Sequence, residues 1–300
     1  MATTLDTKWP AATSLLNSRT RLDRRNVALV GVSTYLTSLT ARSSASTPQA
    51  VRAALARFST WSFVDGVDLV DEVALVDWGD VVDPDGPSGP EAVAAALAHG
   101  RDCEMVLVLG GDNAATWLAL RALAAGDYGG YGLITLDAHL DQRDGRSNGS
   151  PVRQLIDEGL DPRFVVQVGL GEFSNSAPYA RRALKEGVTV VPRAAFREAS
   201  AESLARKALA VAGAGGRRVY VDVDLDVVER SSVPGCPSAV PGGLSADEVR
   251  RFVREVASSN AVVALDVTEV DVERDRDERT VRLAALVVLE ALLGVVRRPR

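Results

Sequence analysis

Residues 137–141 read DAHLD and place two carboxylates and an imidazole at alternate positions, directly after the apolar run LITL. In an extended chain alternate side chains point to the same side, so we expect Asp137, His139 and Asp141 to converge. One histidine among oxygen ligands suits Mn²⁺ or a similar first-row ion, and the lack of thiolates argues against a structural zinc site. The alternative is an acidic loop that happens to contain a histidine.

A second run of carboxylates, VDVDLD at residues 221–226, alternates aspartates with valine and leucine. The apolar partners indicate a buried central strand, in which Asp222, Asp224 and Asp226 share one face. Unpaired buried carboxylates cost several kcal/mol each, so the pattern favours a bound divalent cation over a solvent-facing edge strand. With DAHLD it supplies enough ligands for two ions that share carboxylates, and such pairs generate a hydroxide nucleophile near neutral pH.

Short β-branched segments alternate with alanine-rich segments along the chain. The expected strands cover residues 26–32, 72–78, 104–111, 132–138, 164–170, 187–192, 218–227 and 261–267. The expected helices cover residues 47–58, 90–100, 114–126, 178–187, 200–213, 245–259 and 280–294. This alternation predicts an α/β fold with a mainly parallel eight-stranded sheet. We expect a single domain, residues 1–300, with its core at about 20–296.

Further polar residues gather where two other expected strands end. LGGDN contributes Asp112 and Asn113, and LDVTEVD contributes Asp266, Glu269 and Asp271. Functional residues of parallel sheets collect at the carboxyl ends of the strands. We therefore expect these two segments and both aspartate-rich segments to form one site.

The composition narrows the class of partner. The formal net charge is −6 and no block of lysine or arginine is present, which argues against nucleic acid as a partner. The two cysteines, Cys103 and Cys236, form no disulfide framework and indicate a reduced, cytoplasmic compartment. No apolar stretch approaches the roughly 20 residues needed to cross a bilayer, so we expect no membrane partner.

These motifs resemble those of the ureohydrolases, the family of arginases, agmatinases and formimidoylglutamases. LGGDN is similar to the family's GGDH motif, DAHLD to DAHxD, DVDLDVVERSSVPGCPSAVPGGL to its aspartate-rich motif, and LDVTEVD to its late DxxE motif. The resemblance implies a three-layer α/β/α sandwich, manganese as cofactor, and trimers or hexamers. It also implies a set of manganese ligands, which are Asp137, His139, Asp141, Asp224 and Asp226.

Within the family the sequence is most similar to the formimidoylglutamases, through DAHLDQRDGRSNGSPVRQLI, VGLGEFSNSAPYARRALKEGV and DRDERTVRLAALVV. Asn148 stands where arginases and agmatinases carry a second histidine, and His99 in AALAHG fits a helix end better than a site. The implied reaction is hydrolysis of N-formimidoyl-L-glutamate to glutamate and formamide, a step of histidine catabolism. An arginase- or agmatinase-type guanidino hydrolase is the alternative.

The resemblance assigns Asp141 the role of orienting the attacking oxygen and Glu269 that of holding the cationic nitrogen group. Asn148, Arg153 and Asn175 are further candidate substrate-binding residues. Arg153 could equally lie on a helix surface, Asn175 could cap the helix that follows, and Glu269 could pair with an arginine such as Arg274. An anionic substrate needs pocket cations, for which Arg143, Arg146 and Arg153 are the candidates, and Cys236 could line the same pocket.

One position departs from the family's pattern. Asn113 replaces a histidine that binds the first manganese ion, and an asparagine is a neutral and weaker ligand through its carbonyl oxygen. The departure leaves three outcomes open: a dinuclear site with one loosely held ion, a mononuclear site, or a catalytically impaired member that binds a ligand or serves as a scaffold.

Overall fold

The computed structural model describes residues 8–16, 18–20, 23–40 and 46–299. The predicted span of 1–300 and its core of about 20–296 thus include residues outside the described set. Eight strands form one sheet, in the order β4-β1-β5-β10-β9-β6-β7-β8, and every neighbouring pair is parallel. Their bounds are β1 Arg25–Val32, β4 Val73–Asp80, β5 Met105–Gly110, β6 Tyr131–Leu136, β7 Val165–Leu170, β8 Thr189–Pro192, β9 Arg218–Asp224 and β10 Val262–Thr268.

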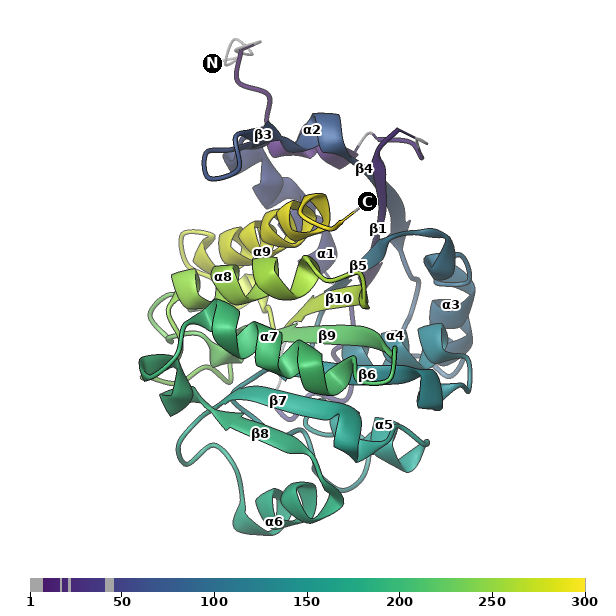
Figure 1. The fold of residues 1–300 in the computed structure, drawn as a ribbon, viewed down its shortest axis with the longest axis vertical. Helices are drawn as coiled ribbons and strands as arrows, with labels where there is room; N and C mark the ends of the chain where they lie inside the picture. The colour runs from purple at the N-terminus through teal and green to yellow at the C-terminus, as the bar shows by residue number, and fades with distance from the viewer. Residues whose placement is uncertain (1–7, 17, 21–22, 41–45, 300) are drawn as a thin grey trace.

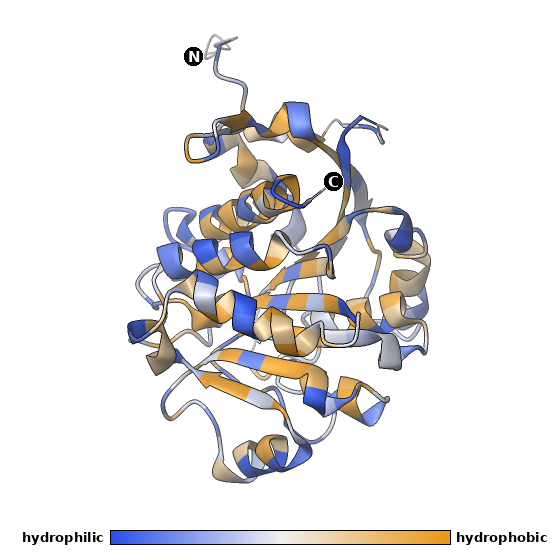
Figure 2. Cartoon of the chain, in the orientation of Figure 1, coloured by the Kyte–Doolittle hydropathy of each residue, from blue (hydrophilic) through white to orange (hydrophobic). Residues whose placement is uncertain are grey.

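Helices cover both faces of this sheet (Figure 1). The main helices are α1 Thr47–Ala54, α3 Gly89–Ala96, α4 Ala114–Ala124, α5 Pro151–Asp157, α6 Ala177–Glu186, α7 Ala201–Ala212, α8 Ala246–Ala257 and α9 Arg279–Val296. One core lies between the sheet and α1, α7, α8 and α9, and a second lies between the sheet and α3, α4 and α5. Much of each strand is apolar, with hydrophilic positions between, while the helices carry hydrophilic residues alongside apolar ones (Figure 2). The predicted three-layer sandwich is confirmed.

The predicted strands and helices recur with small shifts at their ends. The short helices α2 Leu69–Glu72 and α5, and the hairpin of β2 Trp61–Ser62 and β3 Val67–Asp68, were not predicted. The residues that start a helix lie close together in the sequence. Helix α8, for example, begins with a capping box in which the side chains of Ser245 and Glu248 each accept a hydrogen bond from the backbone N–H of the other residue. Among the described residues, no helix combines the length and the apolarity needed to span a membrane.

Four neighbouring strands in the middle of the sheet carry the predicted site residues. β5, β10, β9 and β6 lie side by side, and their carboxyl ends lead into LGGDN, LDVTEVD, the aspartate-rich segment and DAHLD respectively. Segments 150 residues apart in sequence therefore meet at one edge, because parallel strands present all their carboxyl ends on the same side.

Candidate metal centre and substrate pocket

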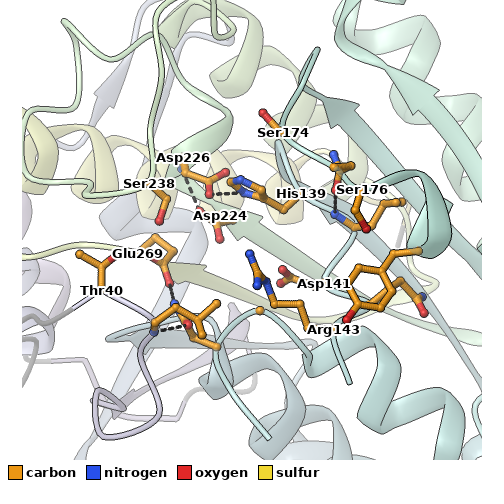
Figure 3. A pocket seen from close by; sticks show the side chains of 17 residues that line it. Thr40, His139, Asp141, Arg143, Ser174, Ser176, Asp224, Asp226, Ser238 and Glu269 are labelled. Atoms are coloured by element: carbon orange, nitrogen blue, oxygen red, sulfur yellow. Dashed lines mark hydrogen bonds and ion pairs between the residues drawn. The ribbon is translucent and has the colours of Figure 1, made fainter. Parts of the chain in front are cut away.

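A cavity of about 250 Å³ opens at this edge of the sheet (Figure 3). Its lining combines predicted residues with others that sequence reasoning missed. The predicted ones are His139, Asp141, Arg143, Asn148, Asn175, Asp224, Asp226 and Glu269. The missed ones include Thr40, Ser174, Ser176, Tyr179 and Ser238. The missed side chains are ordinary hydroxyl groups on loops and a helix, and no spacing in the sequence distinguishes them.

The DAHLD segment lies at the cavity, but not as the extended chain that alternation predicted. β6 ends at Leu136, and Asp141 adopts a left-handed backbone conformation with φ of 50°. The loop is held from within, since His139 N donates to Asp137 Oδ1 at 2.6 Å. Asn175 holds it from outside: its Oδ1 accepts from Leu140 N at 2.8 Å and its Nδ2 donates to Ala138 O at 3.0 Å. The three side chains thus converge through a turn held by hydrogen bonds rather than through a strand.

The aspartate-rich segment also departs from a single strand. β9 ends at Asp224, and Asp226 lies in the 3-10 turn Leu225–Val227, where its N–H donates to Asp224 Oδ1 at 2.8 Å. The turn brings Asp226 Oδ2 to 2.7 Å from His139 Nδ1. Asp222 stays inside the strand, below the cavity, so the expectation that all three aspartates share one strand face is wrong for Asp226.

The arrangement of these groups fits a divalent cation. Asp137, His139 and Asp226 each offer a ligand atom, and these atoms lie within 4.8 Å of one another. Asp137 is 1% exposed, and its Oδ2 has no hydrogen-bond partner among the described residues. Burial, followed by repulsion from neighbouring carboxylates, raises the pKa of Asp137 and Asp224 well above the usual range. Buried carboxylates this close need positive charge between them.

His139 and Asp226 form an ion pair in the metal-free protein. Burial alone would lower the pKa of His139, but Asp226, with help from Asp141 and Glu269, raises it to about 9. Burial would conversely raise the pKa of Asp226, and the pairing with His139 holds it below its usual value. Ligation of a metal requires the neutral imidazole, so a proton leaves His139 when a cation binds.

Asn113 is buried, is not among the residues that line the cavity, and contacts the lining residue Asp141. Its Nδ2 donates to Asp141 Oδ2 at 2.6 Å, and its Oδ1 accepts from the hydroxyls of Thr116 at 2.7 Å and Thr268 at 3.2 Å. The NH₂ group of Asn113 thus faces Asp141, and its carbonyl oxygen faces the two threonine hydroxyls. In this conformation the carbonyl oxygen of Asn113 is engaged by two hydroxyl groups, and its role as a metal ligand stays a prediction.

Glu269 lies opposite DAHLD, directly after β10, in a left-handed conformation with φ of 65°. Its Oε1 accepts from Asn113 N at 3.1 Å and from Asn148 Nδ2 at 2.9 Å. Arg274 forms an ion pair with Asp271 at 3.3 Å. Non-glycine residues in this conformation cluster at functional sites, where surrounding contacts compensate the strain.

The three arginines that were candidates for binding an anionic substrate lie in different environments. Arg143 lines the cavity and its guanidinium is directed into it, between Asp141 and Glu269, without an ion pair to any described residue (Figure 3). Arg146 stacks on the ring of Trp117 at 4.9 Å. Arg153 pairs with Asp157 at 2.5 Å and Glu186 at 2.8 Å outside the cavity. Arg153 therefore does not line the cavity, and its role in substrate binding stays a prediction.

The remaining candidates are resolved as follows. Asn175 lines the cavity and does not cap α6, because the N-cap residue of that helix is Ser176, which makes no side-chain capping bond. Cys236 is fully buried and does not line the cavity. His99 is exposed and lies 3.3 Å from Asp102 on a surface turn. His139 is therefore the single histidine at the site, since the chain has two.

Comparison of the sequence with protein families and with individual proteins finds clear similarities. The sequence model of the arginase family matches residues 25–294. Formimidoylglutamase from Bacillus subtilis (strain 168) is 35% identical over 198 residues, 64% of this chain and 62% of the relative. Proclavaminate amidinohydrolase from Streptomyces clavuligerus is 37% identical over 203 residues, 65% of this chain and 63% of the relative. The matched stretch spans less than two thirds of either relative's length.

The fold agrees over a longer range than these sequence matches. The crystal structure of formimidoylglutamase from Bacillus subtilis subsp. subtilis str. 168 has a TM-score of 0.90 to this chain at 30% identity. The superposition covers 100% of this chain and 96% of the other.

Proposed function

The chain belongs to the arginase family, and from that premise we propose that it is a manganese-dependent hydrolase of a C–N bond in a linear amidine, with N-formimidoyl-L-glutamate as substrate. The observation that carries the proposal is that the lining of one cavity combines the cation Arg143 with the carboxylates Asp141, Asp224, Asp226 and Glu269. In such a cavity the carboxylates can bind a cationic amidine, and Arg143 can bind an anionic group of the same substrate. Formimidoylglutamate has both.

The residues that would hold manganese are Asp137, His139, Asp141, Asp224 and Asp226. All five are hard or borderline donors, as Mn²⁺ prefers, and four of them are buried carboxylates. When bound, the metal lowers the pKa of water and offsets the charge of the carboxylates. Asp137 Oδ2, buried without a hydrogen-bond partner among the described residues, is an atom that such a cation would satisfy.

The side chains around the metal residues would position the substrate. Glu269 holds the cationic nitrogen end of the amidine, and its carboxylate is itself held by Asn113 N and Asn148 Nδ2. Arg143 binds a substrate carboxylate, and Gly149 leaves room for it, since a Cβ there would lie 2.8 Å from Arg143 Cδ. Asp141 accepts a hydrogen bond from the attacking water. Burial raises the pKa of Asp141 to about 7, which suits a group that takes up and returns a proton.

The overall step consumes one water. Its oxygen bonds to the amidine carbon, the bond from that carbon to the glutamate nitrogen breaks, and that nitrogen takes up both protons of the water. The products are formamide and glutamate with its amino group protonated. Asp141, beside the attacking oxygen, is the group that would carry the first of these protons.

The assay that tests the proposal compares substrates and products. Manganese-loaded protein is incubated with N-formimidoyl-L-glutamate, agmatine and arginine, and formamide, glutamate and urea are measured. We expect formamide and glutamate from the first substrate and little urea from the others. Urea release from agmatine or arginine with no formamide would establish a guanidino hydrolase instead. That alternative is less favoured because no second histidine lines the described cavity.

A second candidate function is a catalytically impaired member that binds an amidine or amino acid, or serves as a scaffold. The orientation of the Asn113 amide, with its NH₂ group donating to Asp141, is the observation in its favour. Manganese below one ion per chain under saturating supply, with no product from any amidine, would support this candidate over the enzyme.

We further propose that the protein is a single domain, a homo-oligomer (trimer or hexamer), and a cytoplasmic enzyme of histidine catabolism. Exposed apolar residues support association with other copies: Phe63 is 93% exposed and Phe173 fully so. Light scattering after size exclusion measures the oligomeric state, and calorimetry distinguishes one cooperative unfolding transition from several.

A further inference from the structure

Arg143 reaches the cavity from a loop, residues 142–149, that is closed on itself and packed around the side chain. The backbone N–H of Arg143 donates to Gly149 O at 3.1 Å. A Cβ at Gly149 would lie 2.8 Å from Arg143 Cδ and 3.1 Å from Leu39 Cδ1, so the stem of the arginine is closely surrounded at this point. Its guanidinium is directed into the cavity (Figure 3). The loop therefore fixes the stem and leaves the charged end facing the space for the substrate.

Arg182 on α6 bonds the chain on both sides of Arg143. Its Nη2 donates to the carbonyl oxygen of Gln142, and its Nη1 donates to Asp144 Oδ1 at 2.6 Å. One guanidinium thus bridges the residue before Arg143 and the residue after it. A planar guanidinium suits this role, because its N–H groups point in fixed directions and can donate to two acceptors at once.

Tyr179 adds to this contact from the preceding turn of α6. Residues three apart on a helix are neighbours, and the guanidinium of Arg182 lies 5.0 Å from the centre of the Tyr179 ring. Tyr179 Oη also accepts a long hydrogen bond from Asp144 N, at 3.4 Å. The tyrosine lines the cavity, whereas Arg182 does not. Arg182 therefore contacts the loop that carries Arg143 from outside the space for the substrate.

The bond from Arg182 to Gln142 should matter more than the ion pair with Asp144. The side chain of Asp144 is 73% exposed, and ion pairs at the surface contribute little to stability. Gln142, in contrast, is buried, and a hydrogen bond from a charged donor is stronger than one between neutral groups. Removal of the Arg182 guanidinium should therefore loosen the backbone directly before Arg143.

From these contacts we propose that Arg182 is a positioning residue for substrate selection. With Tyr179 it fixes the loop that carries Arg143, so that the Arg143 guanidinium meets the anionic group of the substrate. The inference rests on the proposed function, in which Arg143 binds a substrate carboxylate. A cation that is held in place before binding loses less conformational freedom when the substrate arrives, and this raises the affinity. Arg182 thus favours amidines that carry an anionic group over amidines that lack one.

The test compares variants of the whole chain, loaded with manganese, on N-formimidoyl-L-glutamate and on formamidine, which lacks the carboxylate. Arg182→Met removes both hydrogen bonds, and Arg182→Lys keeps the charge but replaces the planar fork with a single ammonium group. Arg181→Met is the matched control, since Arg181 is the exposed neighbour on the same helix. Arg143→Met and the double variant Arg143→Met with Arg182→Met complete a double-mutant cycle.

The quantity to compare is the ratio of kcat/KM for formimidoylglutamate to kcat/KM for formamidine. We expect Arg182→Met to lower this ratio by roughly tenfold, mostly through KM. Arg182→Lys should fall between Arg182→Met and the wild type, and Arg181→Met should keep the wild-type ratio. In the Arg143→Met background, loss of Arg182 should change the ratio by less than about twofold, because Arg182 acts through Arg143.

A second measurement follows the loop itself. Hydrogen–deuterium exchange of the metal-free protein reports how firmly the backbone of residues 142–149 is held. We expect exchange in this segment to be faster in Arg182→Met than in the wild type and in Arg181→Met, with β6 unchanged. Exchange at 142–149 that is equal in all three proteins would contradict the positioning role.

Three kinetic results would overturn the inference while leaving the proposed function intact. One is an unchanged ratio in Arg182→Met, whether both substrates lose activity or neither does. Another is full restoration of the ratio by Arg182→Lys, which would show that only the charge of Arg182 matters. The third is an undiminished loss in the Arg143→Met background, which would show that Arg182 acts independently of Arg143. A wild-type protein that releases no formamide from formimidoylglutamate would instead contradict the proposed function, and the inference with it.

Discussion

Replacing Arg143 with methionine removes the positive charge from the substrate cavity and keeps much of the length of the side chain. Because Arg143 has no ion pair with any described residue, the change breaks no salt bridge there and should leave the fold intact. The expected effect is therefore on binding of the substrate's anionic group.

The size of the effect follows from the exposure of Arg143. A hydrogen bond to a charged group contributes about 1.5–3 kcal/mol, and solvent screening of the exposed Arg143 favours the lower end. About 1.5 kcal/mol corresponds to roughly a tenfold lower kcat/KM for formimidoylglutamate. Most of the change should lie in KM, because the carboxylate is held equally in the ground state and the transition state.

The assay pairs two substrates and two variants. Formamidine has the reacting group without a carboxylate, so its turnover should be unaffected by Arg143→Met. Arg146→Met is the matched control, because Arg146 stacks on Trp117 outside the cavity. Equal losses for both substrates, or equal losses in both variants, would refute the assignment of Arg143 to carboxylate binding.

Three further perturbations probe the same cavity. Glu269→Gln keeps the shape of the side chain and the acceptor for Asn113 N but removes the negative charge. We expect kcat/KM to fall by roughly a hundredfold, which corresponds to a loss of about 3 kcal/mol. Unchanged steady-state kinetics would contradict the assignment of Glu269 to substrate binding. The affinity for manganese should rise as the pH rises toward 9, because His139 must lose a proton before it can bind the metal and its pKa without metal is about 9. Calorimetry in buffers of different ionisation enthalpy counts the proton that is released. An affinity that does not depend on pH would contradict this prediction. Asn113→His should bind manganese more tightly, as an imidazole is the better ligand, and an unchanged dissociation constant would show that position 113 does not contact the ion.

Most strands and helices were predictable because the sequence patterns that indicate them extend over only a few neighbouring residues. Apolar β-branched runs and alanine-rich amphipathic runs are set by periodicity within about ten residues, and all eight sheet strands lie where these runs occur. The same reasoning found DAHLD and VDVDLD, since repulsion among closely spaced carboxylates is a property of the sequence. It missed α5 and the β2–β3 hairpin, which are too short to show a period.

The conformation of the site loops depended on contacts from distant segments. Alternation suggested that Asp141 and Asp226 extend from strands, whereas both lie in turns. The turn at Asp141 is stabilised by hydrogen bonds to Asn113 and Arg153, and the turn at Asp226 by His139. No local pattern encodes a turn that is held by partners elsewhere in the chain.

The tertiary structure also decided which side chains enter the cavity and which lie outside it. Arg143 and Arg153 are equally basic and both follow DAHLD, yet one enters the cavity and the other pairs with Asp157 and Glu186. The sequence by itself determined that this chain carries a set of carboxylates and one histidine suited to a divalent cation. Which arginine meets the substrate, and which way the amide of Asn113 turns, depend on the packing of separate strands and helices, because the partners that orient these groups come from distant segments.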